Sequence, residues 1–184
     1  RNSAKGDTDI VRKPSNGTGS EETVLADDAT TPSGLSPDGR FLMYSRVDLK
    51  TGSDLWVQPL ASDSGKKLEP QSFLQTPFNE DRPRFSPDGK WVAYQSNESG
   101  RLEIYVARFP GGGGTRQISL AGGRAARWRS DGKEIYYMAL DGTIMAAPVN
   151  IKTDSIEVGE ARRLFGPVAI YLNTYRYDVS ADGQ

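Results

Sequence analysis

The chain of 184 residues contains neither cysteine nor histidine. Without cysteine it can form no disulfide and no thiolate metal site. Without histidine it cannot by itself build a Ser-His-Asp or Cys-His catalytic centre, nor a histidine-ligated zinc site. We therefore predict that the chain is not itself an enzyme and that it uses no cofactor.

Strong charge and long apolar runs are also missing. The 23 basic and 24 acidic residues leave a net charge of −1, whereas nucleic-acid-binding domains are usually strongly basic. No apolar stretch approaches the roughly 20 residues that are needed to span a bilayer. The sequence therefore predicts no nucleic-acid partner and no membrane insertion by this segment.

What the chain does contain is an internal repeat. A motif related to Ser-Pro-Asp-Gly recurs four times, with its aspartates at intervals of 50, 43 and 51 residues. The four copies lie at 35–40, 85–90, 128–133 and 179–184. A second motif is an acidic residue followed by an apolar run. It alternates with the first motif along the chain, and its copies start at Asp9, Asp54, Glu103 and Asp141. Two motifs that recur in the same order indicate a repeated structural unit.

The first motif suits a tight hairpin turn. Proline presets φ at about −65°, aspartate can bond the nearby backbone, and glycine accepts the positive φ that closes the turn. The third copy departs from this pattern, with Arg129 and Ser130 in place of serine and proline. We predict a structural role for the turn residues, which are Pro37, Asp38, Gly39, Pro87, Asp88, Gly89, Asp131, Gly132, Asp182 and Gly183.

The segments that follow the turns are nearly continuous in apolar residues. The runs 40–45, 90–95 and 133–138 do not alternate, which is typical of strands covered on both faces. Each unit reads as four short antiparallel strands, and no segment has the periodicity of an amphipathic helix. These features predict an all-β fold, a β-propeller that is partial or open.

About three and a half four-stranded blades are expected in a single propeller segment spanning residues 1–184. The predicted blade parts are 1–31, 32–76, 82–120, 124–166 and 174–184. Because open terminal blades would leave apolar side chains in water, we expect one of two forms of completion. Either a homodimer closes about seven blades, or further chain completes the ring.

The repeat resembles a known family. Residues 85–94 followed by 103–110 resemble the TolB-like, WD40-like propeller repeat, and 128–137 is similar to a further copy. The stretch from 54–60 to 73–80 is similar to the propeller attached to bacterial serine/threonine kinases. The resemblance implies a sensory or scaffolding module of a larger bacterial protein, in the periplasm or another extracytoplasmic site. The chain itself contains no kinase motif.

Arginines on the predicted innermost strands are the candidate ligand-binding residues. Strands nearest the axis of a propeller line its central channel, and arginine forks suit carboxylates and phosphates. The expected partner is a protein or peptide, or an acidic small ligand, held at the channel mouth. The alternative is that the arginines are solvated or pair with Glu80, Asp81 and Asp131. The candidates are Arg82, Arg84, Arg124, Arg127, Arg129, Tyr175 and Arg176.

Two sets of acidic or oxygen-bearing residues are assigned structural roles. One loop carries oxygen ligands of the kind that calcium prefers, at Asp48, Thr51, Ser53 and Asp54, but their spacing does not match a calcium-binding loop. No metal site is therefore predicted. The acids that precede the third strands are expected to make a repeated hydrogen bond, for example to backbone amides; they are Asp9, Asp54 and Glu103.

The predicted function is non-catalytic binding of a protein or ligand. The alternative is the substrate-gating propeller of a prolyl-oligopeptidase-type serine peptidase. No Gly-x-Ser-x-Gly nucleophile elbow occurs in the sequence, so on that reading the hydrolase lies elsewhere in the parent protein.

Overall fold

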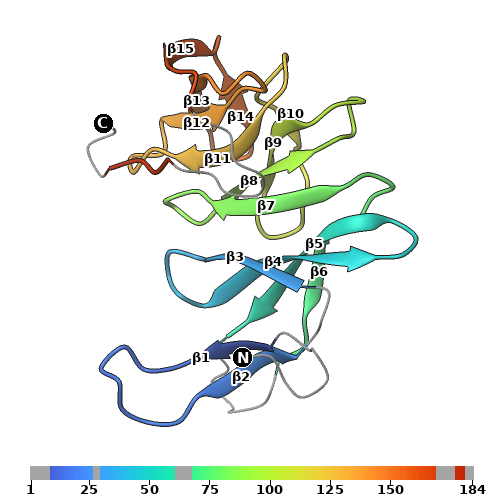
Figure 1. Cartoon of the computed structure of the whole chain (residues 1–184), viewed down its shortest axis with the longest axis vertical. Helices are drawn as coiled ribbons and strands as arrows, with labels where there is room; N and C mark the ends of the chain where they lie inside the picture. The colour runs from blue at the N-terminus through green and yellow to red at the C-terminus, as the bar shows by residue number, and fades with distance from the viewer. Residues whose placement is uncertain (1–8, 27–29, 61–67, 169–176, 181–184) are drawn as a thin grey trace.

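A computed structural model describes residues 9–26, 30–60, 68–168 and 177–180 (Figure 1). Within these ranges the chain forms strands and turns, and none of it is a helix that could cross a membrane. The strands are β1 (Asp9–Arg12), β2 (Glu22–Ala26), β3 (Thr30–Leu35), β4 (Phe41–Asp48), β5 (Gly52–Pro59), β6 (Gln71–Leu74), β7 (Glu80–Phe85), β8 (Trp91–Ser96), β9 (Glu103–Arg108), β10 (Arg116–Gln117), β11 (Arg124–Trp128), β12 (Glu134–Met138), β13 (Ile144–Ile151), β14 (Ile156–Val158) and β15 (Arg162–Phe165).

The strands form antiparallel sheets that follow one another in chain order. A hairpin of β1 and β2 precedes a four-stranded sheet of β3 to β6, and β7 to β10 form a second. In the third sheet β11, β12 and β13 pair in order, and β13 pairs with both β14 and β15. The all-β architecture of successive four-stranded units is therefore confirmed.

Two strands differ from the sequence prediction. The short strand β14 was not expected; it lengthens the hairpin at the end of β13 through the pairs of Asn150 with Glu157 and of Ile151 with Ile156. The last strand of the second unit, β10, is only two residues long, although the predicted blade extends to residue 120. There the backbone N–H groups of Ile118 and Ser119 both approach the carbonyl oxygen of Ile104, which ends the regular ladder.

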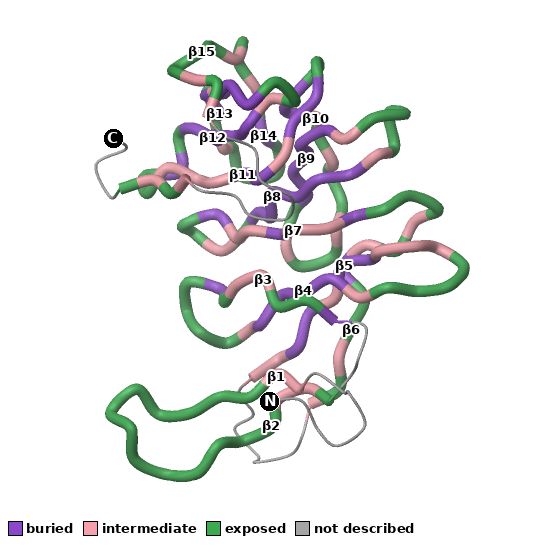
Figure 2. Tube along the Cα trace, viewed as in Figure 1, coloured by how far each residue is buried: buried purple, intermediate pink, exposed green. Residues whose placement is uncertain are grey.

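The apolar core lies between neighbouring sheets. One buried cluster joins the first sheet to the second and contains Met43, Leu55, Val92 and Tyr94. The other joins the second sheet to the third and contains Trp91, Ile135 and Tyr137. Alternate residues of β8 thus enter opposite cores, so that every residue of β8 is buried (Figure 2). This two-sided burial explains the nearly continuous apolar run of its sequence.

A buried serine and an exposed aspartate hold each of the first two turns. The Ser86 hydroxyl donates to Asp88 Oδ1 at 2.6 Å and accepts the Trp91 N–H at 2.9 Å. Asp88 Oδ1 also accepts the Lys90 N–H at 3.1 Å. The first turn makes the same set of bonds. The closing glycines have the positive φ that such a turn requires, at Gly39 (+69°), Gly89 (+71°) and Gly132 (+72°).

The third turn replaces the serine hydroxyl by a guanidinium group. Arg129 Nε and Nη2 donate to the two carboxylate oxygens of Asp131, each at 2.7 Å. Arg129 Nη1 donates to Glu134 at 2.7 Å, and Asp131 accepts the Lys133 N–H at 2.9 Å. The guanidinium and this N–H lower the pKa of Asp131 to about 2.

We predict that Ser86→Ala destabilises the fold by about 1–3 kcal/mol, because the buried Trp91 N–H loses its acceptor. Urea unfolding measures the change. The control is Ser155→Ala, since Ser155 is exposed and its replacement is expected to change stability by less than about 0.5 kcal/mol. Equal effects of the two substitutions would contradict a structural role for the turn hydroxyl.

We predict that the contribution of Asp131 to stability depends on pH. Its pKa in the folded chain, about 2, is below the ordinary value of 3.8. Ionised Asp131 therefore stabilises the fold above about pH 4, and this contribution is lost as the pH falls through about 2. Asp131→Asn is expected to be less stable than the parent near neutral pH, by an amount that shrinks between about pH 4 and pH 2. Urea unfolding at several pH values tests this; a constant difference would contradict it.

Candidate functional site

The first strands of the three larger sheets lie next to one another. Strand β7 contacts β3 on one side and β11 on the other (Figure 1). The segment 177–180 lies against β11, where the Tyr177 hydroxyl donates to the Ala125 carbonyl oxygen. The predicted arginines of β7 and β11 are thereby brought to a common region of the molecule.

A bulge interrupts each of these first strands at the same place in the repeat. The register shifts lie between Pro32 and Gly34, between Asp81 and Arg84, and between Arg124 and Arg127. At the equivalent position of β7 and β11, φ is positive for a residue other than glycine: +53° at Arg82 and +58° at Ala125. Such conformations are costly, and they concentrate at functional sites.

Arg84 lies at the junction of the three first strands. Its guanidinium Nη1 donates to the carbonyl oxygen of Ser33 in β3. Its own carbonyl oxygen accepts the indole N–H of Trp128 in β11 at 3.1 Å. Burial, together with the positive charges of Arg127 and Arg82, lowers the pKa of Arg84 to about 10. The guanidinium is thus held where its own charge is disfavoured.

Arg127 combines a ring contact with a weak ion pair. Its guanidinium carbon is 5.8 Å from the centroid of the Tyr177 ring, and its Nε is 3.6 Å from a carboxylate oxygen of Asp178. The Asp178 side chain is 90% exposed, whereas that of Arg127 is 23% exposed. Burial raises the pKa of Tyr177, so its hydroxyl stays neutral and can donate to an acceptor.

We call Arg82, Arg84 and Arg127 the arginine cluster. Two carboxylates act on it electrostatically: Asp178 on Arg84, and Asp81 on Arg82. Despite Asp178, burial and the other two guanidinium groups still lower the Arg84 pKa. Additional negative charge at this place therefore stabilises the ionised cluster.

The other predicted site residues do not join the cluster. Arg124 donates to the Leu140 carbonyl oxygen at 3.0 Å, and Arg129 is bound by Asp131 in the third turn. Glu80, an expected alternative partner of the arginines, accepts the Thr76 hydroxyl at 2.5 Å. Four predicted residues lie outside the described ranges: Tyr175, Arg176, Asp182 and Gly183.

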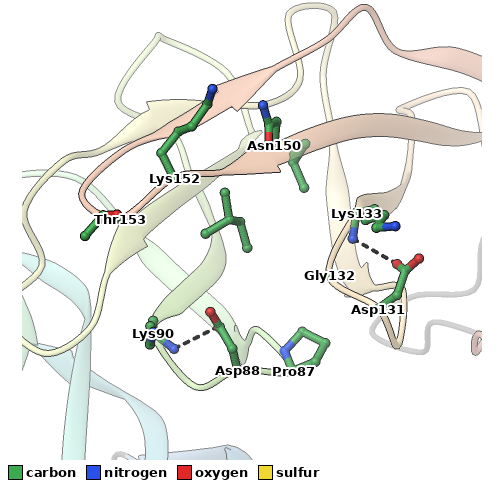
Figure 3. Close-up of a pocket in the computed structure, with 11 residues that line it drawn as sticks. Pro87, Asp88, Lys90, Asp131, Gly132, Lys133, Asn150, Lys152 and Thr153 are labelled. Atoms are coloured by element: carbon green, nitrogen blue, oxygen red, sulfur yellow. Dashed lines mark hydrogen bonds between the residues drawn. The ribbon is translucent and has the colours of Figure 1, made fainter.

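A separate open hollow of about 810 Å³ lies between the second and third turns (Figure 3). Lys90, Lys133 and Lys152 line it, together with the turn carboxylates Asp88 and Asp131. Both carboxylates accept backbone N–H groups of their own turns. The hollow includes no member of the arginine cluster, so the two regions are distinct.

No protein-family model matches the chain, and no curated protein matches it. Solved structures do match. An Agrobacterium tumefaciens protein described as TolB is 19% identical, with a TM-score of 0.66 over 87% of this chain and 59% of its own. The β-propeller domain of the Trilobed protease from Pyrococcus furiosus is 20% identical, with a TM-score of 0.51 over 73% of this chain and 42% of its own. A puromycin-hydrolyzing peptidase of Mycobacterium tuberculosis is 14% identical, with a TM-score of 0.53 over 83% of this chain and 32% of its own.

The chain has a β-propeller fold. Its larger sheets are blades, and the structural neighbours include TolB-like propellers. At these identities the likeness concerns the fold alone, because propellers carry unrelated functions. The chain spans 59% of the length of the Agrobacterium protein. The arginine cluster lies on the first strands of adjacent blades, the strands that face the axis of a propeller.

Sequence reasoning missed part of this site. It did not identify the left-handed backbone of Arg82 and Ala125, because such positions favour glycine and neither residue is one. It also left out Asp178, which pairs with Arg127 only through the approach of 177–180 to the third blade. Asp178 and Arg127 are far apart in the sequence, so no local sequence pattern indicates their contact.

We predict that the bulge stores backbone strain that glycine relieves. Ala125→Gly removes the cost of a left-handed alanine, whereas Ala126→Gly only loses a buried methyl group and loosens the chain. Both alanines are buried, which makes the second variant a matched control. The first is expected to be the more stable of the two by about 1–2 kcal/mol in urea unfolding. Equal stabilities would show that the bulge is unstrained.

Proposed function

We propose that the chain is a non-catalytic propeller module that binds an acidic peptide or an acidic small ligand through the arginine cluster. The observation that carries this proposal is the position of Arg84, where burial and then the neighbouring guanidinium groups of Arg127 and Arg82 lower its pKa to about 10. A carboxylate or phosphate relieves this repulsion and bonds the guanidinium forks directly. Tyr177 contributes a ring face to Arg127.

The sequence resemblance supports a finer assignment. Its likeness to the propellers of bacterial serine/threonine kinases supports a sensory or scaffolding module of a larger protein, acting outside the cytoplasm. The acidic ligand is then the signal, or a partner that the module recruits. Closure of the ring by a second copy, and the division of the chain into the predicted blade parts, remain predictions.

We predict that Arg84→Ala combined with Arg127→Ala weakens binding of an acidic ligand by about 100-fold or more, since two charge-assisted contacts are lost. The probe is a fluorescein-labelled hexaglutamate peptide, with inorganic phosphate as competitor. Fluorescence anisotropy at low and high salt gives the affinities. Binding to the parent chain is expected to weaken as salt increases, because the contacts are electrostatic.

The matched control is Arg116→Ala combined with Arg163→Ala, which removes the same charge from exposed positions. It is expected to retain binding within about threefold, since only long-range attraction changes. If both double variants lose binding equally, the peptide responds to net charge and the assignment of a site to the cluster is wrong. Circular dichroism checks that each variant is folded.

A substrate-gating propeller is the second candidate, favoured by the structural likeness to a puromycin-hydrolyzing peptidase. A gate excludes large substrates and needs no affinity for acidic ones. Binding of uncharged and acidic peptides with equal strength would favour this candidate over the first.

A further inference from the structure

The second blade has a buried carboxylate, Glu103, at the start of its third strand, β9. Its contacts show how the fold accommodates an acid at this position. Glu103 is fully buried. Its Oε1 accepts Arg101 Nε at 2.7 Å and the Gly122 N–H at 2.8 Å, and its Oε2 accepts the Ser119 hydroxyl. Both oxygens are bonded, and a guanidinium group balances the charge.

The equivalent place in the first blade holds two carboxylates. Asp54 occupies the position of Glu103 in the repeat, and Glu80 approaches it from the start of β7; both side chains are almost completely buried. Asp54 Oδ2 accepts the Thr51 hydroxyl at 2.7 Å, and Glu80 Oε1 accepts that of Thr76 at 2.5 Å. Asp54 Oδ1 and Glu80 Oε2 are buried and have no hydrogen-bond partner.

The exchange of residues between the two blades explains how both acids fit. Gly123, directly before the third blade, corresponds in the repeat to Glu80 at the start of the second blade, and a Cβ on Gly123 would lie 2.5 Å from Ser119 Oγ. The longer side chain of Glu103 already reaches this space. In the first blade the shorter Asp54 leaves room for Glu80, whereas Gly52 takes the place of Arg101.

The junction between the first and second blades therefore has an additional buried carboxylate, and it lacks the guanidinium group that Arg101 supplies at the next junction. Arg46 is the cross-strand neighbour of Asp54, but its guanidinium carbon lies 5.2 Å from the centroid of the Trp56 ring. Burial raises the pKa of Glu80, and the charges of Asp54 and Glu98 raise it further. Among the described residues, no ion pair within 4.0 Å involves Asp54 or Glu80.

We propose that Asp54 and Glu80 bind a calcium ion between the first and second blades, in the role that Arg101 has at the next junction. The unpartnered oxygens of the two carboxylates are its ligands, and the hydroxyls of Thr51 and Thr76 lie beside them. The described residues contain no group of three acidic or other metal-ligating side chains suited to a metal, so hydroxyl or carbonyl oxygens complete the coordination. Calcium accepts such an irregular set of oxygens, whereas magnesium demands a near-octahedral shell and retains its waters.

The test is calcium titration of the full chain after treatment with a chelator. Isothermal calorimetry is expected to show one calcium ion per chain, and the thermal midpoint is expected to rise with calcium concentration, since the folded state alone forms the site. Glu80→Gln is expected to weaken calcium binding by on the order of 100-fold, because a charged ligand is lost. In chelator it is expected to unfold at a higher temperature than the parent, because the repulsion between the carboxylates is gone.

The matched control is Glu157→Gln, which removes one charge from an exposed carboxylate of the third blade. It is expected to bind calcium as the parent does. The proposal is wrong if calcium produces neither heat nor a thermal shift in the parent chain. It is also wrong if Glu80→Gln and Glu157→Gln respond to calcium alike. If calcium has no effect on the parent chain but mild acidification stabilises it, the two carboxylates share a proton and bind no calcium ion.

Discussion

Burial of each central strand between two sheets is the constraint on which the structure depends. In β8 the side chains of Trp91 and Ala93 enter one core and those of Val92 and Tyr94 enter the other. A sheet of this kind cannot be stable alone, because both of its apolar faces would remain in water. The stacking of blades follows from this composition, and the first strands of adjacent blades are thereby brought together at one edge.

The turns show that the repeat preserves an interaction rather than a residue. Ser86 closes its turn by bonding both Asp88 and a backbone N–H, and Arg129 holds Asp131 at the corresponding place by a two-pronged ion pair. Arg129 is for this reason unavailable to the arginine cluster. An arginine near an innermost strand is thus no guide to binding until its carboxylate partners are known.

The sequence was sufficient to predict the propeller and most of its strands, because turn chemistry and two-sided burial leave local signals. It did not predict features that depend on contacts between blades. The bulge at Ala125 and the approach of Asp178 to Arg127 arise from packing across the repeat. The pairing of Asp54 with Glu80 joins residues on different blades, and the loop spacing around Asp54 gave no indication of it. Arg82, Arg84, Arg124 and Arg127 lie on first strands, whereas Arg129 lies in the turn after β11. The separation of the arginines into a cluster and a structural ion pair required the structure.

Departures from the repeat point to function most directly where they leave charge unbalanced. Positions that differ between blades but keep their bonds satisfied, such as Arg129 in place of Ser86, need no ligand. The arginine cluster and the pair of Asp54 and Glu80 differ in this respect, since each gathers like charges where burial makes them costly. The two imbalances have opposite sign and lie in different parts of the blades. An anion bound at the arginine cluster and a cation bound between Asp54 and Glu80 would each remove the free-energy cost of holding like charges together. The apolar cores otherwise offset this cost.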